Sequence, residues 1–400
     1  MKMISGSVTA PKGFKAGGVS CGIKKNNQPD LALIVSDLPA TAAGIFTTNK
    51  VQAAPVLLSK QHLQNGHAQA IIANSGNANA CVGPVGDQTA LTMAETAGQL
   101  FKLKKEDVLV ASTGVIGVQL PVAKIQTGLL QKSDIVSNTG GSAAAKAIMT
   151  TDTFPKEAAV EFELDGQTVK IGGIAKGSGM IHPNMATMLG FITSDAAISP
   201  KMLQQALLEA GEHSFNRITV DGDTSTNDSL IALANGMAGN REIDVIGPDY
   251  QLFLTGLTTV CLELAKMVAK DGEGATKLVE IKVTAAASEA EAVKLGKSIA
   301  TSNLVKTAIF GEDANWGRIL AAAGYSGVEF NPAQVDIYLG DLLVCQGGVG
   351  LEFDETQAKA ILAQKELLIS VHLGTGTNTA SVWTCDLSYD YVKINGSYRT

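Results

Sequence analysis

The most unusual chemistry-bearing stretch of the chain is residues 175–193, where a glycine-rich segment with a lysine leads to Met-Ala-Thr-Met-Leu and an apolar run. Two interpretations of Thr187 in this stretch are possible from the sequence. One is a threonine that packs in a strand. The other is a nucleophile that attacks the carbonyl of Ala186, so that an N→O acyl shift and hydrolysis split the chain. The small residue at 186 and a strained turn, for which Gly177 and Gly179 are suited, fit the second reading.

Cleavage before Thr187 creates an N-terminal threonine with a free α-amine. This amine has an ordinary pKa of about 7.7–8.0, so part of it is unprotonated at neutral pH. It can therefore act as the base that activates the hydroxyl of its own residue. The second reading thus predicts acyl transfer through a covalent ester.

A second candidate segment is residues 111–117, Ala-Ser-Thr-Gly-Val-Ile-Gly, which follows a predicted strand at 108–111. A small hydroxyl residue and a glycine at the end of a strand can direct an O–H and a backbone N–H at one point. That is the layout of an oxyanion hole, which stabilises the negative charge of an acyl-transfer intermediate. A simple turn is the other reading of the same residues.

Other reaction classes have little support. The Gly-Val-Ser-Cys-Gly pattern at 18–22 lacks the strand and helix that a nucleophile elbow needs. The segment 221–229 resembles a calcium loop, but Thr226 and Ala232 stand where glycine and glutamate belong. It remains a polar loop at the rim of a site or a solvated turn. The five histidines and five cysteines have no zinc spacing and no CxxC pair, so we expect no metal and no disulfide framework.

The composition indicates a soluble globular protein. Of the 400 residues, 45% are hydrophobic and 17% charged, which suits a large core. A formal charge of -7 argues against nucleic-acid binding. No run approaches the roughly 18 uninterrupted apolar residues of a membrane helix, and residues 1–18 have no signal-peptide pattern. We therefore expect a cytoplasmic protein.

Strand-like and helix-like segments occur in runs and not in strict alternation, which favours layered α+β over a doubly wound sheet. Predicted strands are 31–35, 70–73, 108–111, 278–283, 335–339 and 367–372; predicted helices are 88–102, 122–131, 201–212, 250–270 and 289–298. Asp87, Pro121 and Ser199-Pro200 are the start signals of the first three helices.

The candidate segments also resemble motifs of a known enzyme family. Residues 176–189, Lys-Gly-Ser-Gly-Met-Ile-His-Pro-Asn-Met-Ala-Thr-Met-Leu, are similar to the self-processing signature of the ornithine acetyltransferase family of arginine biosynthesis, and 112–117 to its oxyanion-hole segment. Five further blocks are similar to the family in the family's order: 74–81, 149–156, 220–228, 270–277 and 311–318. The match spans essentially the whole chain.

The resemblance implies a reaction and its residues. The chain would cleave itself between Ala186 and Thr187, and Thr187 would take an acetyl group from N-acetylornithine and pass it to glutamate. Thr113, through its hydroxyl, and Gly114, through its N–H, would form the oxyanion hole. The implied substrate contacts are Thr150, Lys176, Thr187, Glu273, Asn395 and the C-terminal Thr400. Thr151 and Thr153 lie beside Thr150 and remain alternatives to it.

The family's architecture is also implied. We expect an α+β fold with two stacked β-sheets between helix layers, an αββα-type sandwich, and a smaller C-terminal α/β lobe. An α chain 1–186 and a β chain 187–400 would share the core, in a heterotetramer of two α and two β chains. No cofactor is expected, and acetyl-CoA as a second acetyl donor is left open. The rival reading is an amide hydrolase or aminopeptidase of the same self-processing architecture.

Overall fold

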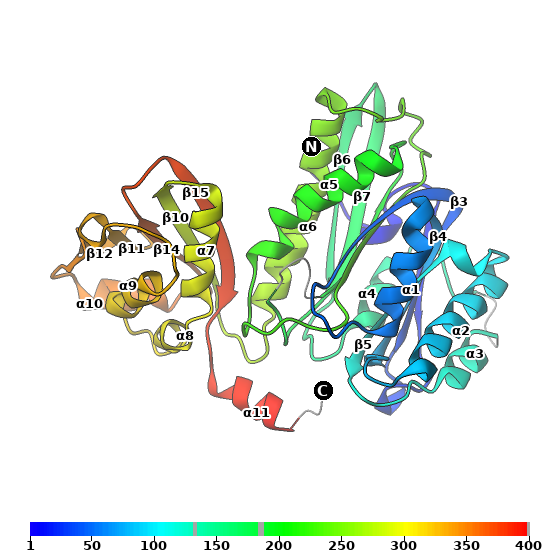
Figure 1. The fold of residues 1–400 in the computed structure, drawn as a ribbon, viewed down its shortest axis with the longest axis horizontal. Helices are drawn as coiled ribbons and strands as arrows, with labels where there is room; N and C mark the ends of the chain where they lie inside the picture. Colours follow the sequence, from blue (N-terminus) through cyan, green and yellow to red (C-terminus); the bar gives the residue numbers. More distant parts are fainter. Residues whose placement is uncertain (131–133, 183–187, 398–400) are drawn as a thin grey trace.

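The computed structural model describes residues 1–130, 134–182 and 188–397. The described strands form two sheets, one of nine strands and one of six, and each sheet builds its own lobe (Figure 1). Helices cover both sheets, so the expected α+β class with two sheets is confirmed. The two sheets belong to different lobes with separate apolar cores, so they are not the stacked pair that the sequence led us to expect.

The first lobe is organised around the nine-stranded sheet, in which β1-β6-β7-β8-β9-β3-β4-β5 are neighbours and β2 pairs with β3. Its strands are β1 (Lys2–Met3), β2 (Phe14–Val19), β3 (Leu31–Phe46), β4 (His67–Asn77), β5 (Val108–Val115), β6 (Lys156–Leu164), β7 (Gln167–Lys176), β8 (Leu189–Ser194) and β9 (Ser229–Ala234).

The long strand β3 connects the two halves of this sheet. Its first part pairs with β2 and β4, its second part pairs with β9, and the register with β4 shifts between Val35 and Ala40. Leu31 and Leu33 pack with the helices on one side, whereas Ala32 and Ile34 share a core with apolar residues of β8 and β9. Both faces of the strand are therefore buried, which explains why this segment is a continuous apolar run.

Strands β8 and β9 lie between β7 and β3, in the middle of the sheet. They follow residue 187 in the sequence, whereas β1 to β7 precede it. The first core is thus built from chain on both sides of the Ala186–Thr187 bond, and it would stay shared between the two fragments if that bond were cut.

The helices form layers on the first sheet. Figure 1 shows α1–α3 on one side of it and α5 and α6 on the other. Helix α6 is long and apolar enough to cross a membrane by length and composition alone, but its buried face packs on β6, β7 and α5, as expected of a core helix. The helices are α1 (Ala54–His62), α2 (Pro84–Phe101), α3 (Val122–Leu130), α4 (Gly141–Ile148), α5 (Pro200–Glu212), α6 (Pro248–Lys270), α7 (Glu289–Ala300), α8 (Asn303–Phe310), α9 (Trp316–Gly324), α10 (Glu355–Leu362) and α11 (Tyr389–Ser397).

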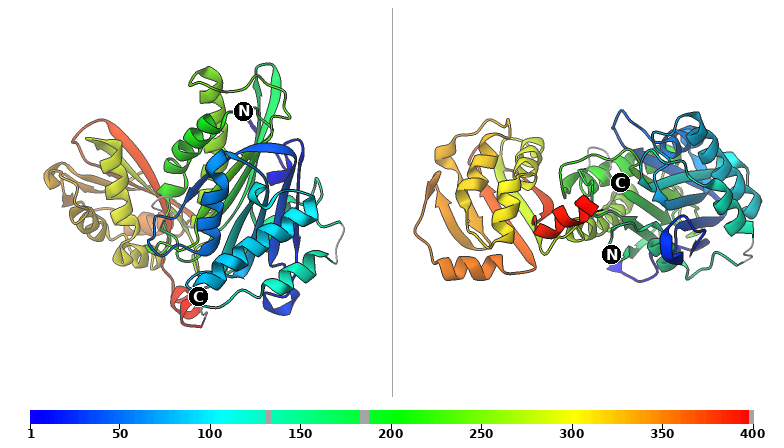
Figure 2. Two further views of the ribbon diagram at one scale, coloured as in Figure 1. Left: turned by 45° about the vertical axis from the view of Figure 1, so that its right-hand side comes forward. Right: turned by 90° about the horizontal axis from the view of Figure 1, so that it is seen from below.

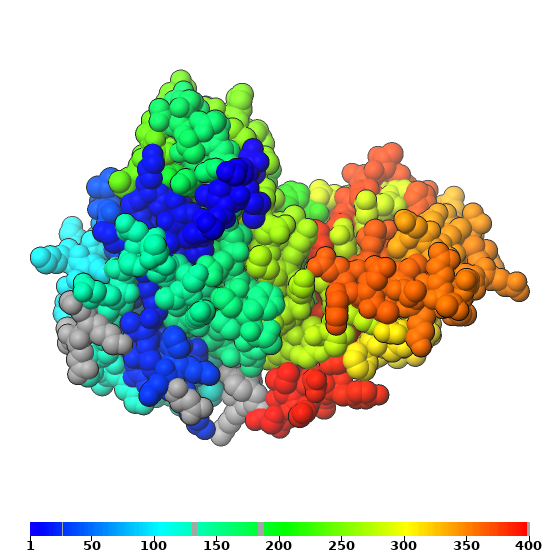
Figure 3. All heavy atoms as spheres, turned by 180° about the vertical axis from the view of Figure 1, so that it is seen from behind, coloured from blue at the N-terminus to red at the C-terminus, as the bar shows by residue number. Residues whose placement is uncertain are grey.

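The second lobe is the smaller C-terminal one, with the strand order β13-β12-β11-β14-β10-β15. Its strands are β10 (Leu278–Ala286), β11 (Asp336–Leu339), β12 (Leu342–Gln346), β13 (Val349–Gly350), β14 (Glu366–His372) and β15 (Asn378–Cys385). After β15 the chain leaves this sheet and forms α11, the last described element. This helix lies between the two lobes when the molecule is seen from below (Figure 2) and next to the first lobe when it is seen from behind (Figure 3).

All the predicted strands and helices exist, with changed bounds. Ser199 caps α5 as expected, since its side chain accepts a hydrogen bond from Met202 N. The start signal assigned to Asp87 is wrong: α2 begins at Pro84, and Asp87 lies in its first turn, where a carboxylate favours the helix dipole.

Candidate active site

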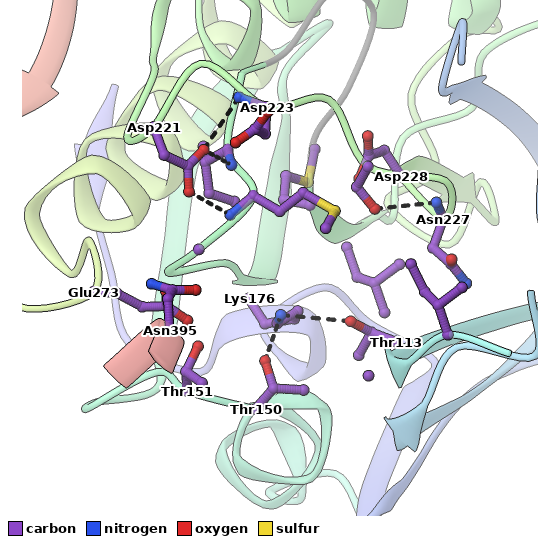
Figure 4. Close-up of a pocket in the computed structure, with 18 of the residues that line it drawn as sticks. Thr113, Thr150, Thr151, Lys176, Asp221, Asp223, Asn227, Asp228, Glu273 and Asn395 are labelled. Atoms are coloured by element: carbon purple, nitrogen blue, oxygen red, sulfur yellow. Dashed lines mark hydrogen bonds between the residues drawn. The ribbon is translucent and has the colours of Figure 1, made fainter. Parts of the chain in front are cut away.

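A cavity of about 140 Å³ lies where β5 and β7 end and where β8 and β9 begin. Figure 4 shows polar side chains converging on it from the first sheet, from the segment after α6 and from α11. Its lining residues are Thr113, Gly114, Ile116, Thr150, Thr151, Lys176, Gly179, Met180, Ile181, Met188, Leu189, Asp221, Asp223, Ser225, Asn227, Asp228, Glu273, Tyr391 and Asn395.

The structure brings together every predicted site residue that it describes. The residues that line the one cavity are Thr113, Gly114, Thr150, Lys176, Glu273 and Asn395. Thr187, Ala186 and Thr400 lie outside the described residues. Met188, one peptide bond after Thr187, lines the cavity and accepts a hydrogen bond from Ser229 N at 2.9 Å. The strand that follows the predicted nucleophile therefore starts at the cavity wall.

Thr113 and Gly114 lie in the last part of β5, opposite an irregularity of β4 at Gly76 and Asn77. Gly114 has a φ of 131°, which disfavours any side chain. A Cβ there would also lie 2.4 Å from the carbonyl carbon of Gly76, so the two backbones approach too closely for another residue. This packing fixes the backbone that carries both predicted oxyanion donors.

Lys176, the last residue of β7, is buried and directs its ammonium group into the cavity. Its Nζ donates to Thr150 Oγ1 at 2.7 Å and to Thr113 Oγ1 at 3.5 Å (Figure 4). The same Nζ lies 3.9 Å from Asp152 Oδ2. Burial lowers the pKa of Lys176, and Asp152 opposes this effect, while Lys156 adds to it. The cavity thus holds a buried cation near an uncharged hydroxyl pair.

A buried ion network supports Lys176 from behind. Lys156 Nζ lies 2.6 Å from Asp152 Oδ1 and 2.6 Å from Asp271 Oδ2, with all three side chains almost fully buried. Burial by itself would raise the pKa of Asp152, but Lys176 and Lys156 lower it below the ordinary carboxyl value. Asp152 also accepts from the N–H groups of Gly177 and Thr150, so it joins the start of the glycine-rich segment to the threonine.

The three neighbouring threonines, Thr150, Thr151 and Thr153, differ in whether they line the cavity. Thr150 lines the cavity and binds Lys176, and Thr151 lines it as well. Thr153 instead hydrogen-bonds Asp271 through its N–H and its hydroxyl and lies in a different depression of the surface. Thr153 is therefore excluded from the cavity, and Thr150 has the closer link to the buried lysine.

Glu273 forms an acidic end of the cavity. It is only 7% exposed, and its Oε2 accepts a hydrogen bond from Asn395 Nδ2 at 2.7 Å. Its N–H donates to Ser178 O at 3.0 Å. A Cβ at Gly179 would lie 2.4 Å from the Glu273 carboxyl carbon, so glycine at 179 is what allows this carboxylate to approach the segment.

Asp221 fixes the segment that leads toward the predicted cleavage site. Its carboxylate accepts from the N–H groups of Met180 and Ile181 at 2.6 and 2.8 Å. Met180 has a φ of 57°, which is strained for a residue with a side chain. Burial raises the pKa of Asp221, and burial together with Asp221 raises the pKa of Tyr391, whose hydroxyl donates to Asp221 at 3.4 Å.

The loop that resembles a calcium site is a rim of this cavity. Asp221, Asp223, Ser225, Asn227 and Asp228 of the 221–229 segment all line it, which confirms the rim reading. Within the described residues, no group of three or more His, Cys, Asp and Glu side chains could hold a metal ion.

The pattern at 18–22 is not a nucleophile elbow. The chain after β2 forms a 3-10 turn, Lys25–Asn27, in place of an α-helix, and Ser20 is not among the residues that line the cavity.

Several residues of the site had no role in the sequence analysis. Asp152 and Lys156, four positions apart, lie in the 149–156 block, and Asp271 lies in the 270–277 block. The signal that could have identified these residues is their charge, because each lies inside a block that already resembled the family. Tyr391 gave no signal, because it belongs to a polar C-terminal segment without a motif.

A buried cavity of this kind, with titratable groups whose pKa values are shifted in opposite directions, is typical of an enzyme that acts on a small polar molecule. Among the described residues, one lysine, Lys176, and four carboxyl groups line the same space. The model of the ArgJ family matches residues 15–400. The chain therefore belongs to the ArgJ family, and the enzyme class expected from its sequence blocks, an ornithine acetyltransferase of arginine biosynthesis, is confirmed.

A curated relative covers the full chain, and two solved structures each cover about half of it. The arginine biosynthesis bifunctional protein ArgJ of Symbiobacterium thermophilum is 52% identical over 100% of both chains. A crystal structure of arginine biosynthesis bifunctional protein ArgJ from Bacillus halodurans is 48% identical, with a TM-score of 0.52, and covers 53% of this chain and 100% of its own. A crystal structure of the Mycobacterium tuberculosis ornithine acetyltransferase complexed with ornithine is 42% identical, with a TM-score of 0.44, and covers 46% of this chain and 99% of its own.

Proposed function

We propose that this chain is a self-cleaving acetyltransferase that moves the acetyl group from N-acetylornithine to glutamate through an acetyl ester on Thr187. The observation that carries the proposal is the cavity itself, which collects the described residues of the predicted site around Met188, the neighbour of Thr187. Thr187 would first attack the carbonyl of Ala186 and, once freed as an N-terminal residue, the acetyl carbonyl of the substrate.

Chain lengths support cleavage before Thr187. The solved Bacillus halodurans chain is covered completely by 53% of this chain, which is about 212 residues. The segment from Thr187 to Thr400 has 214 residues, so a fragment of this size fits the proposed β chain. The strained backbone at Met180 and its anchoring by Asp221 lie in the segment before the proposed scissile bond, where strain would promote an acyl shift.

The charges of the cavity match the substrates. N-acetylornithine has an α-carboxylate and a δ-ammonium group, and glutamate has two carboxylates. Lys176 would bind the α-carboxylate, and its ammonium is already held by Thr150. Glu273, held by Asn395, would receive the δ-ammonium, and we propose that the C-terminal carboxylate of Thr400 shares this role. Buried charges are stable only when paired, so a ligand with complementary charges would stabilise both ends.

Thr113 and Gly114 would stabilise the oxyanion of the tetrahedral intermediate. Their support is the close packing of β5 against β4, which fixes Gly114 and leaves Thr113 on the cavity wall. No resident cofactor is part of the proposal, because the nucleophile, its base and the oxyanion donors all come from the chain. Acetyl-CoA would enter as a second acetyl donor, which would make the enzyme bifunctional.

We also propose that the four layers of the family are formed within the first lobe. One sheet folds at β3, so that its halves β2-β3-β4-β5 and β6-β7-β8-β9-β3 face each other across a shared core. The helices α1–α3 and α5–α6 then cover the outer faces. The α chain 1–186 and β chain 187–400 would share this core and assemble in the cytoplasm as two α and two β chains.

The test of the function uses the purified protein with N-acetylornithine, with and without glutamate. Ornithine release that requires glutamate, together with N-acetylglutamate formation, supports the transferase. Equal release without glutamate identifies the rival amide hydrolase instead. Adding acetyl-CoA and glutamate without acetylornithine then distinguishes one activity from two.

The test of processing is intact mass analysis. We expect two fragments, the second starting at Thr187, and a single chain of 41.4 kDa for Thr187→Ala. A wild-type protein that stays in one piece contradicts self-cleavage. Thr187→Ser keeps a hydroxyl and should still be cleaved.

A further inference from the structure

One carboxylic acid in the cavity has no role in the function proposed above. Asp228 precedes β9, is 2% exposed and lines the cavity. Its backbone O accepts from Thr47 N at 3.0 Å, and its carboxyl group hydrogen-bonds Ser225 and the side chain of Thr47. Its Oδ2 has no hydrogen-bond partner among the described residues. Because an unpaired buried oxygen costs free energy, a partner from outside the described residues would stabilise this carboxyl group.

Asp228 lies beside the start of β8, the strand that follows the predicted nucleophile in the sequence. The next residue, Ser229, pairs with Leu189 at the start of β8, and its N–H binds Met188 O. The preceding residue, Asn227, donates to Ser112 O at 2.9 Å, which ties the loop to the residue before Thr113. Asp228 is therefore fixed between the strand that follows the nucleophile and the strand that carries the oxyanion pair, on the cavity wall (Figure 4).

Lys176 and Asp228 line the same cavity and have opposite charges. Each interacts electrostatically with the other, yet no ion pair joins them. A free α-amino acid has an ammonium and a carboxylate on the same carbon atom. With the carboxylate on Lys176, the ammonium would need a carboxylate partner, and Asp228 has a carboxyl group in the cavity whose Oδ2 has no partner among the described residues.

We propose that the Asp228 carboxyl group binds the α-amino group of the acceptor amino acid and takes the proton that this group must lose before it attacks the acetyl ester. This inference rests on the proposed function and adds a catalytic residue to it. It also adds a selection rule, since the acceptor must be a primary amine beside a carboxylate.

The proton and bond changes balance. The acceptor ammonium gives one proton to the Asp228 carboxylate, and its nitrogen lone pair then forms a bond to the acetyl carbonyl carbon. The bond from that carbon to Thr187 Oγ breaks, and the remaining extra proton of the nitrogen goes to the threonine oxygen. Asp228 afterwards releases its proton to water. In the first half of the reaction the same steps run backwards and protonate the leaving amine of ornithine.

The electrostatics of Asp228 suit this exchange. Burial raises the pKa of Asp228 well above the ordinary carboxyl value, while Ser225 and Lys176 oppose that rise. A carboxyl group with a raised pKa is a better base for an ammonium than an exposed aspartate, and general base catalysis works best near the operating pH. The other ionisable groups that line the cavity are Asp221, Asp223, Glu273 and Tyr391.

The experiment measures transfer from a preformed acetyl-enzyme. Wild type and Asp228→Asn are incubated with N-acetylornithine until the β chain carries the acetyl group by mass, and ornithine is then removed by gel filtration. Loss of the adduct is followed at pH 7 with glutamate and, separately, with hydroxylamine. Hydroxylamine is an amine that is already neutral at this pH, so it needs no base to become a nucleophile.

Asp228→Asn should slow transfer to glutamate by about 10²–10⁴-fold, the range typical of a general base, and leave transfer to hydroxylamine unchanged. Asp244→Asn, which removes an exposed carboxylate that does not line the cavity, should leave the ratio of the two rates unchanged. Equal losses with both acceptors, or no loss with either, would overturn the proposal. Asp228→Glu, which keeps the carboxyl group, should retain part of the glutamate rate and serves if the asparagine variant does not fold.

Failure of the proposed function gives a different result. In that case wild type forms no acetyl adduct on the fragment that starts at Thr187, whatever residue stands at 228. An adduct that forms in wild type and transfers equally fast to glutamate in both proteins rejects only the role of Asp228.

Discussion

Asn395 and Glu273 are 122 residues apart in the sequence and joined by a 2.7 Å hydrogen bond from amide to carboxylate. Asn395 belongs to α11, which has no buried residue and reaches the cavity after the chain has left the second lobe. The bond fixes one Glu273 oxygen and leaves the other available to a ligand. The C-terminal segment thus completes the acidic end of the cavity.

This relationship predicts a substrate-selective effect of Glu273→Gln. The change removes the charge that would pair with the δ-ammonium of N-acetylornithine, and loss of one partner of a buried charge pair costs about 2–5 kcal/mol. The KM for N-acetylornithine should rise accordingly, whereas that for N-acetylglutamate in the reverse direction should change much less, because it has no ammonium. Steady-state kinetics with both substrates check this. Equal losses would indicate a structural role for Glu273.

Thr113→Ala should reduce kcat by about 10²–10³-fold, because it removes one donor to the oxyanion. The KM for N-acetylornithine should change little, since the oxyanion exists only in the transition state and the intermediate. Thr113→Ser keeps the hydroxyl and is the matched control, expected to retain most of the activity. Processing should slow in the alanine variant as well, which a time course of fragment formation measures. Unchanged turnover and processing in Thr113→Ala would remove Thr113 from the oxyanion hole.

Much of the fold could be predicted from the sequence where the pattern is local. The run at 31–35 indicated a strand because both faces of β3 are buried, and Ser199-Pro200 marked the start of α5. Strands β6 and β7 were not predicted. They form a hairpin in which charged and apolar residues are mixed, as in Lys-Glu-Ala-Ala-Val-Glu-Phe-Glu-Leu, and its register depends on neighbours distant in the sequence.

Part of the site could be predicted from the resemblance of sequence blocks to a family, and not from local periodicity. Lys176, Glu273 and Asn395 were assigned from sequence blocks, and the structure brings them to one cavity. Asp228 and Asp152 lie in the same blocks, but a sequence does not show which of several carboxylates is buried. Their roles depend on burial and on neighbouring charges, which only the folded chain defines.

Lys156→Met should strongly destabilise the fold. The lysine bridges Asp152 and Asp271 in the interior, and its removal leaves buried Asp271 without this cation and Asp152 with only Lys176, at 3.9 Å. Breaking a buried pair in this way costs about 3–5 kcal/mol. Lys2→Met removes an exposed partner of Glu161 and should cost about 0–1 kcal/mol. Urea denaturation of both variants measures the difference, and similar losses for the two would show that the buried network contributes no more than a surface pair.

The last prediction concerns the pH dependence of stability in Asp228→Asn. Burial raises the pKa of Asp228 in the folded chain above the ordinary unfolded value of about 3.9. The folded state then binds a proton that the unfolded state has released, so the contribution of Asp228 to stability is fully present below about pH 3.9 and is lost as the pH rises through the folded pKa. Asparagine does not titrate in this range, so the variant lacks this pH-dependent contribution.

Asp228→Asn should therefore gain stability relative to wild type as the pH rises from 4 to 8, by about 1.4 kcal/mol for each unit by which the pKa is raised. The free energy of unfolding from urea titrations at several pH values, with Asp223→Asn as the exposed control, tests this. A difference between wild type and Asp228→Asn that does not vary with pH would mean that the Asp228 pKa is not raised. Slower transfer to glutamate combined with greater stability at neutral pH would show that the buried carboxylate is retained at a cost to the fold.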